Sequence, residues 1–155
     1  GRILQSIKIN FLESQIKPFL KRFLKRDRHF YNQMKEIGYH GFNTYAFALL
    51  FQSYPNHDFW TSDLFKKILN YFSSTEFSKN IKKTKYGFPY NPPGIELLAT
   101  SKIFGEVFEF DLDFVDDLWN HQIEVSLNRE SGLLSEGSFD KNTNMARAYE
   151  AILCL

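Results

Sequence analysis

The sequence predicts an all-α protein of antiparallel helical hairpins, with about six main helices and one short extended segment near residues 107–113. Three observations predict it. Apolar residues recur at three- and four-residue spacings between stretches rich in Gly and Pro. The 155 residues are 43% hydrophobic, enough for one packed core. The sequence also contains no dinucleotide-binding glycines, phosphate loop or heptad seam. Residues 1–155 therefore form a single α-helical domain or a fragment of a larger one.

The first half of the chain predicts three helices. Residues 14–26 alternate apolar positions with lysines and arginines, which indicates an amphipathic helix with a basic outer face. Pro18 lies in the first turn of this helix, or kinks a helix that begins earlier. A shorter helix over residues 31–37 is expected to stop at Gly38. Residues 45–51 are apolar on every side, which predicts a buried helix surrounded by others.

The second half predicts helices separated by conspicuous loops. Three of the five prolines lie within residues 86–94, which excludes helix there. Residues 107–114 alternate aromatic or aliphatic with acidic side chains, which favours an extended segment. The remaining predicted elements are a helix over 62–72 capped by Ser62 or Thr61, helices over 95–104 and 114–127, a loop over 128–141 and a last helix from about 142.

Charge is segregated along the chain although the net charge is only +1. Residues 1–36 hold nine Lys and Arg against three acids, and residues 104–155 hold three against eleven. One interpretation is that basic and acidic faces meet inside the fold or between copies of it. The other is a basic surface for an anionic polymer, formed by segments 17–28 and 79–85. The sequence argues against nucleic acid as that polymer, because no recognition motif accompanies the charge.

The termini and the single cysteine limit the compartment and the cofactors. Cys154 excludes an intrachain disulfide and a thiolate metal cluster, and it is expected to be a buried structural thiol. Residues 1–4 do not resemble a signal peptide, and no apolar run could span a membrane, so we expect a cytoplasmic protein without a membrane partner. The apolar end, residues 151–155, suggests that the natural protein continues. No cofactor is expected.

Three segments resemble the α/α-toroid, or six-hairpin, superfamily of carbohydrate-active enzymes. They are residues 39–50, the loop 88–96 and residues 144–150. Such a toroid has about twelve helices, so this chain would supply half of the ring, either as a fragment or by pairing with a second copy. The resemblance implies that loops before the inner helices carry sugar-stacking aromatics and catalytic carboxylates or histidines. One branch binds zinc through several cysteines, and this sequence has only Cys154.

The candidate catalytic residues are His40, Glu96 and Glu150. His40 has a free pKa near neutrality and could act as general acid or base, or simply hydrogen-bond a neighbouring helix. Glu96 follows Pro92-Pro93-Gly94 at a predicted helix start, where the dipole should keep it ionised. Glu150 can serve a pocket with Arg147, or the two can form an ordinary pair three residues apart. A metal site is not expected, because no histidine pair has a ligand spacing.

The candidate substrate-binding residues share a place beside loops or on the last helices. We expect them to stack on, or hydrogen-bond to, sugar rings, although core packing explains Trp119 equally well. They are Tyr39, Asn43, Tyr90, Asn91, Trp119 and Arg147.

Aromatic residues make up 17% of the chain, and this excess is the main compositional clue to function. Taken with the toroid resemblance, it implies a carbohydrate-active α-helical domain of the glycoside hydrolase, lyase or epimerase type, with a glycan or sugar as ligand. The alternative is a non-catalytic interaction module whose charge-complementary ends bind each other, a second copy or the remainder of a longer chain. Whether the chain is an enzyme stays open at this point.

Overall fold

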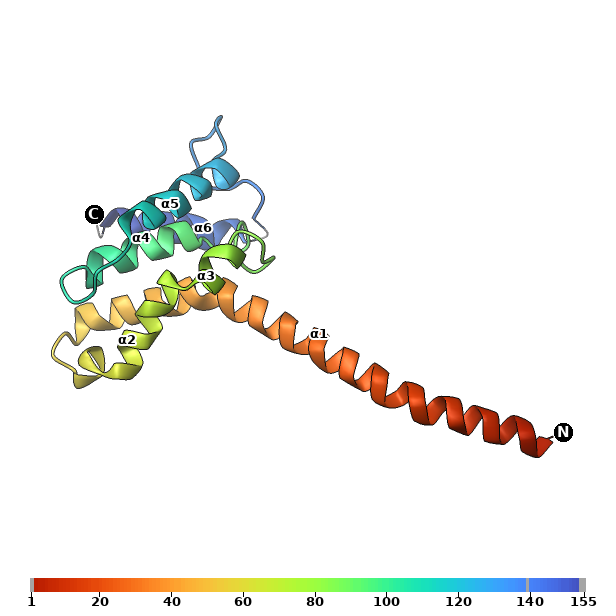
Figure 1. Ribbon diagram of the computed structural model, residues 1–155. Helices are drawn as coiled ribbons and strands as arrows, with labels where there is room; N and C mark the ends of the chain where they lie inside the picture. The colour runs from red at the N-terminus through yellow and green to blue at the C-terminus, as the bar shows by residue number, and fades with distance from the viewer. Residues whose placement is uncertain (1, 139, 154–155) are drawn as a thin grey trace. The chain divides into compact units, whose positions relative to one another are not determined.

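The computed structural model describes the backbone of residues 2–138 and 140–153, and the side chains of residues 28–138, 140–150 and 152 (Figure 1). The all-α prediction is confirmed. Two compact units divide the chain, Gly1–Gln33 and Met34–Leu155. The helices of the described part are α1 (Arg2–Ser53), η1 (Asp58–Thr61), α2 (Asp63–Asn70), η2 (Tyr71–Ser73), α3 (Thr75–Asn80), α4 (Pro93–Phe104), α5 (Leu112–Ser126) and α6 (Lys141–Leu153).

The three helices predicted before residue 53 form one helix, α1, so the expected stop at Gly38 is wrong. Gly38 serves close packing, because a Cβ there would lie 2.5 Å from the carbonyl carbon of Tyr86. Pro18 lies inside α1 and not in its first turn, as in the alternative of an earlier start. The side chains of the basic residues 17–26, and Cys154, lie outside the described residues.

Short polar side chains begin the helices of the second half. The hydroxyl oxygen of Ser62 accepts a hydrogen bond from the amide of Phe65 at the start of α2, which confirms the predicted cap. Ser74 caps α3 in the same way, and Asp111 caps α5. Asp140 accepts hydrogen bonds from the amide and the hydroxyl of Thr143 at the start of α6. These contacts fix where each helix enters the domain.

Helix α4 is the centre of the larger unit and packs against both α5 and α6 (Figure 1). It begins at Pro93, after the proline-rich loop. A Cβ on Gly94 would lie only 2.3 Å from the carbonyl oxygen of Leu118 in α5, so the first turn of α4 touches the backbone of α5. The side chain of Asn91 donates hydrogen bonds to the carbonyls of Gly38 and Tyr86 and ties the preceding loop to α1.

The predicted short extended segment near residues 107–113 forms no strand, although Asp111 keeps an extended backbone. The described residues contain no strand, only an isolated bridge between Leu127 and Leu134, and α5 begins at Leu112. Phe108 and Phe110 do pack against the core, but Leu112 is 66% exposed. The alternation therefore reflects a short irregular connection whose aromatic side chains reach the core, followed by a helix that turns Leu112 outward.

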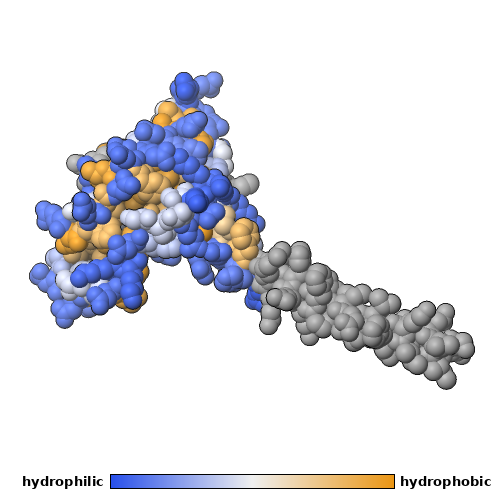
Figure 2. Space-filling view, viewed as in Figure 1, coloured by the Kyte–Doolittle hydropathy of each residue, from blue (hydrophilic) through white to orange (hydrophobic). Residues whose placement is uncertain are grey.

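Most of the aromatic residues whose side chains the structure describes belong to one packed core. Rings of α1, η1, α2 and α4 meet edge to face or tilted, among them Phe51, Trp60, Phe65 and Phe104. The aromatic excess therefore has a structural explanation over much of the domain. The segment 45–51 is less enclosed than expected, because Leu49 and Leu50 are 39% and 48% exposed. On the face seen in Figure 2, apolar residues lie among hydrophilic ones.

None of the helices that the structure describes combines the length and the apolar character needed to cross a membrane.

Candidate functional site

Glu96 is held at the centre of the larger unit by the first turn of α4. Its amide donates to the carbonyl of Pro92, and its side chain is completely buried. The carboxyl group faces α1 at Gly41, where a Cβ would lie 3.0 Å from Oε2. Gly41 thus leaves the room that the carboxyl group occupies, and Glu96 is where the sequence placed it, at the start of a helix.

The protonation state of Glu96 differs from the expectation. Neither carboxyl oxygen has a hydrogen-bond partner among the described residues. Burial raises the pKa of Glu96 to about 8, while the guanidinium of Arg147, with Nε 3.8 Å from Oε1, lowers it. The expected ionised carboxylate is therefore wrong at neutral pH, because loss of hydration outweighs both the helix dipole and Arg147. Glu96 holds a proton there and could donate it.

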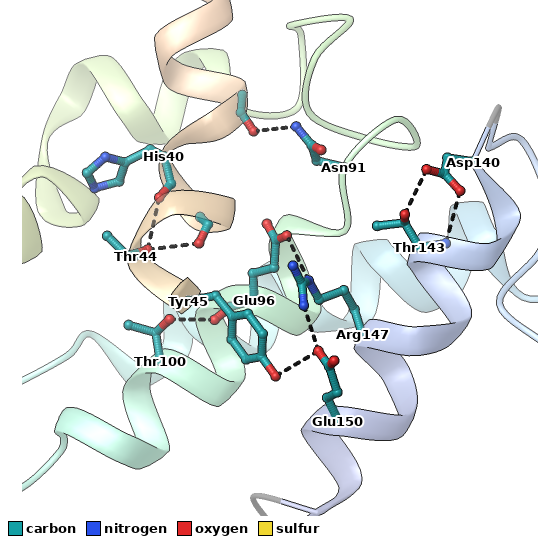
Figure 3. A network of polar contacts seen from close by, with 12 residues as sticks. His40, Thr44, Tyr45, Asn91, Glu96, Thr100, Asp140, Thr143, Arg147 and Glu150 are labelled. Atoms are coloured by element: carbon teal, nitrogen blue, oxygen red, sulfur yellow. Dashed lines mark hydrogen bonds and ion pairs between the residues drawn. The ribbon is translucent and has the colours of Figure 1, made fainter. Parts of the chain in front are cut away.

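Arg147 lies between two carboxyl groups, as Figure 3 shows. Its Nη1 donates to Oε2 of Glu150 at 2.6 Å, and the hydroxyl of Tyr45 donates to the same oxygen at 3.0 Å. The guanidinium carbon is 4.6 Å from the ring centroid of Tyr45 and 5.2 Å from that of Phe42. The pairing of Arg147 with Glu150 at a spacing of three is therefore present. We call Tyr45, Glu96, Arg147 and Glu150 the carboxylate–arginine cluster.

Several buried polar atoms at this cluster lack a hydrogen-bond partner within the described part of the chain. Besides both oxygens of Glu96, they include Nε of Arg147 and Oδ1 of Asn144, one turn earlier on α6. Most buried polar groups in proteins are hydrogen-bonded, so such a concentration is unusual. It offers acceptors and a donor to a small molecule rich in hydroxyl groups, or to water.

The outer edge of the cluster reaches the surface. The side chain of Glu150 is 39% exposed and that of Arg147 17%, while that of Glu96 is enclosed. A ligand arriving from solvent would therefore meet Glu150 and Arg147 first, with Glu96 at the inner end.

His40 does not join the cluster. It lies within α1 and not in a loop, because the helix continues through Gly38 and Gly41. Its ring packs edge-on against Tyr71, Phe72 and Phe77, and Nε2 donates to the carbonyl of Ile68 at 3.0 Å. Burial lowers its pKa to about 4, while the bond to Ile68 raises it. His40 points away from Glu96 in Figure 3 and joins α1 to α2.

Four of the predicted sugar-binding residues lie on α1 or in the proline-rich loop. Tyr39 and Tyr90 meet at the surface, where the hydroxyl of Tyr39 donates to that of Tyr90 at 3.2 Å. Asn43 is exposed on α1. Asn91 is 5% exposed, and its amide is occupied by the two carbonyls that fix the loop. Asn91 therefore holds the proline-rich loop against α1.

Trp119 lies apart from these residues. It lines a groove of about 400 Å³ whose other walls are apolar side chains of α4, α5, α6 and the loop around Leu134. Gln122, three residues further along α5, is completely buried, with its Cβ 2.8 Å from the position of a Cβ on Gly94. The aromatic candidates therefore do not converge on one pocket.

Sequence reasoning missed Tyr45, Phe42 and Asn144 as members of the site. Tyr45 was counted as part of an apolar helix, although it supplies the only hydroxyl among residues 45–51. A lone hydroxyl in such a run must find a partner once it is buried, which is the signal that could have identified it. Asn144 and Arg147 share one face of a helix at a spacing of three, which is a second usable signal.

The fold and the site together define an all-α domain with a buried, proton-holding carboxyl group beside a paired arginine. Among the described residues, no group of three or more His, Cys, Asp or Glu side chains is arranged to hold a metal ion.

Comparison with known proteins gives one relative for this domain. The chain is 35% identical over 153 residues to a protein of Haloferax volcanii named Archaeal glycosylation protein Q. The match covers 97% of this chain and 40% of the relative, so the chain spans well under half of the relative's length. No family model and no solved structure matches the chain, and the resemblance to an α/α toroid stays a prediction.

This relative contradicts the predicted function. It is named for glycosylation and not for a glycoside hydrolase, lyase or epimerase, so that prediction is wrong. The looser association of the chain with carbohydrate agrees with the relative's name. Self-association, binding to the remainder of a longer chain and a cytoplasmic location stay predictions.

Proposed function

We propose that this chain is part of a protein that acts in glycosylation, and that its domain binds a saccharide at the carboxylate–arginine cluster. The relative named for glycosylation supports the pathway, because it matches nearly the whole of this chain. The single observation that supports binding at this site is the set of buried polar atoms around Glu96 and Arg147 that have no hydrogen-bond partner among the described residues. Saccharides are rich in hydroxyl groups that both donate and accept hydrogen bonds, and they complement such a set.

The geometry of Arg147 supports the same proposal. One edge of its guanidinium is used by Glu150, while Nε has no hydrogen-bond partner among the described residues. A planar guanidinium held against two aromatic rings is fixed in orientation, so it can present its remaining donors to a hydroxyl group at little entropic cost. Glu150, already oriented by Tyr45, retains accepting capacity at the exposed edge.

The protonated Glu96 gives the inner end of this site a donor. An ionised carboxylate only accepts, whereas a neutral carboxyl group donates one hydrogen bond and accepts others. Buried acids kept neutral at pH 7 occur at functional sites, where they donate to a ligand oxygen. In this proposal the neutral carboxyl group of Glu96 would donate a hydrogen bond to a saccharide oxygen bound beside Arg147.

Ligand-observed NMR titration of the 155-residue chain with a panel of neutral mono- and disaccharides tests this proposal. Arg147→Lys keeps the charge but removes the planar fork, and Glu150→Gln removes the charged acceptor. We expect each variant to weaken saccharide binding about tenfold or more, since hydrogen bonds to charged groups contribute about 1.5–3 kcal/mol. Circular dichroism checks that each variant is folded.

Glu109→Gln provides the matched control, because Glu109 is exposed on the connection before α5. It should bind as the unchanged chain does. The proposal fails if no saccharide binds, or if Arg147→Lys and Glu150→Gln bind as well as this control.

A further inference from the structure

Three tyrosines form an exposed group where the proline-rich loop meets α1. The ring centroids of Tyr39, Tyr86 and Tyr90 lie 6.1 to 6.2 Å from one another. Tyr90 is 37% exposed, and the other two are partly buried. We call these three residues the tyrosine patch. Aromatic rings at a surface offer apolar faces with polar hydroxyl tips, which suits molecules that are polar at their edges.

Two lysines flank the tyrosine patch. The ammonium nitrogen of Lys35 is 5.8 Å from the ring centroid of Tyr39, and that of Lys85 is 5.2 Å from the ring centroid of Tyr86. The segment from residue 77 to residue 95 carries four lysines and no acidic residue. Lys82, one of the four, is paired with Asp117 at 2.8 Å. Lys35 on α1 and Lys85 before the proline-rich loop thus bring two cationic groups to the tyrosine patch.

The tyrosine patch is continuous with the carboxylate–arginine cluster through one residue. Phe42 lies one turn beyond Tyr39 on α1, with ring centroids 6.1 Å apart, and its other neighbour is the guanidinium of Arg147 at 5.2 Å. A saccharide at Glu150 and Arg147 could extend over Phe42 toward Tyr39 and Tyr90. The two groups of residues are thus parts of one surface.

The backbone under the tyrosine patch is fixed before any ligand arrives. Gly38 allows the backbone of Tyr86 to touch α1, and Asn91 bonds the carbonyls of both Gly38 and Tyr86. Thr84 adds a hydrogen bond of 2.7 Å to the carbonyl of Met34. A site already held in place loses little entropy on binding.

We propose that the tyrosine patch and its lysines form a subsite for an anionic saccharide, one that carries a carboxylate or a phosphate. This inference rests on the proposed function and assigns the charge of its ligand. The tyrosine rings contact the apolar faces of the sugar, while Lys35 and Lys85 pair with its acidic group. The basic segment 79–85, which had no assigned role, then provides attraction for an acidic ligand.

Three probes with the same ring test the subsite: glucose, glucuronic acid and glucose 6-phosphate. Ligand-observed NMR gives the dissociation constant of each with the unchanged chain at low and at moderate salt. We expect one or both acidic probes to bind about tenfold more tightly than glucose at low salt, with the difference shrinking as salt rises. The comparison of glucuronic acid with glucose 6-phosphate shows which acidic group is preferred.

The double variant Lys35→Ala/Lys85→Ala should remove this preference and leave glucose binding unchanged. The control Lys66→Ala/Lys102→Ala changes net charge equally at exposed positions on α2 and α4 and should keep the preference.

The outcomes separate the two proposals. Glucose and the acidic probes binding equally well would overturn the charged subsite while the saccharide site stands. Equal loss of preference in the two double variants would also overturn it, since net charge alone would then explain the effect. Binding of none of the probes or of the neutral panel would overturn the saccharide site itself.

Discussion

His40 is partly buried and Glu96 completely buried; both are ionisable and neutral at pH 7, yet their surroundings differ. Burial lowers the pKa of His40 to about 4 and raises that of Glu96 to about 8. His40 has a hydrogen-bond acceptor in the carbonyl of Ile68 and aromatic rings around it. Glu96 has no hydrogen-bond partner in the described part of the chain. A shifted pKa by itself therefore does not mark a functional group; the unmet hydrogen-bonding capacity distinguishes the two.

The largest expected effect comes from removing His40. His40→Ala would leave a cavity among Tyr71, Phe72 and Phe77 and remove the donor from the Ile68 carbonyl. We expect the free energy of unfolding to fall by about 3 kcal/mol, measured by urea denaturation. Saccharide affinity of the folded protein should stay the same. His29→Ala, at an exposed position, is the control, and a loss below about 1 kcal/mol would show that His40 does not join α1 to α2.

A smaller effect is expected from Arg147→Met. The variant removes the ion pair with Glu150 and the charge nearest to Glu96. Because Glu150 is partly exposed, we expect a loss of about 1–2 kcal/mol in the free energy of unfolding. The pKa of Glu96 should rise further, since Arg147 is what lowers it. Carbon-13 NMR of the glutamate carboxyl group measures that pKa, and an unchanged value would mean that Arg147 does not act on Glu96.

The most informative dependence of stability on pH comes from Glu96→Gln. Native Glu96 binds its proton more tightly than the unfolded chain does, so stability falls as pH rises from about 4.5 to about 8. Native His40 binds its proton less tightly, so stability rises with pH from about 4 to about 6.5. In the unchanged chain these slopes oppose each other between about 4.5 and 6.5, and the decline due to Glu96 stands alone above that range.

Glu96→Gln mimics the neutral carboxyl group and does not titrate, so above about pH 4.5 it should escape the loss of stability that Glu96 causes and be more stable than the unchanged chain at pH 6. It should abolish the decline between pH 6.5 and 8 and expose the rise due to His40 at lower pH. Thermal unfolding at closely spaced pH values measures both slopes. If the decline above pH 6.5 persists in this variant, Glu96 is not the group that titrates there.

Much of the fold could be predicted from sequence because local signals determine it. Ser62 caps α2, Pro89 and Pro92 lie in the loop before α4, and Glu96 falls in the first turn of α4. The wrong predictions concern residues whose structural role depends on a contact with a segment that is distant in the sequence. Gly38 has the sequence signal of a helix end, but its actual role is close packing against Tyr86. The alternation of residues 107–114 indicates a strand, but Leu112 is exposed to solvent.

The candidate site was predicted in part for the same reason. A spacing of three residues brings Arg147 and Glu150 together, and that is visible in the sequence. The approach of Glu96 to Arg147, and the separation of His40 from both, depend on how α1, α4 and α6 pack. No local pattern specifies that packing. Desolvation of Glu96 is a property of the same packing, so its protonation could not be predicted from the residues alone.

The contact of Gly94 with Leu118 has a consequence for how this site can vary. With the position of a Cβ only 2.3 Å from a backbone oxygen, residue 94 leaves no room for any side chain. Glu96 lies two residues further on, so its depth is set by main chain against main chain and not by the sizes of its neighbours. The surrounding apolar side chains can therefore be exchanged over generations while the acid stays at the same depth. Position 94 should therefore accept only glycine.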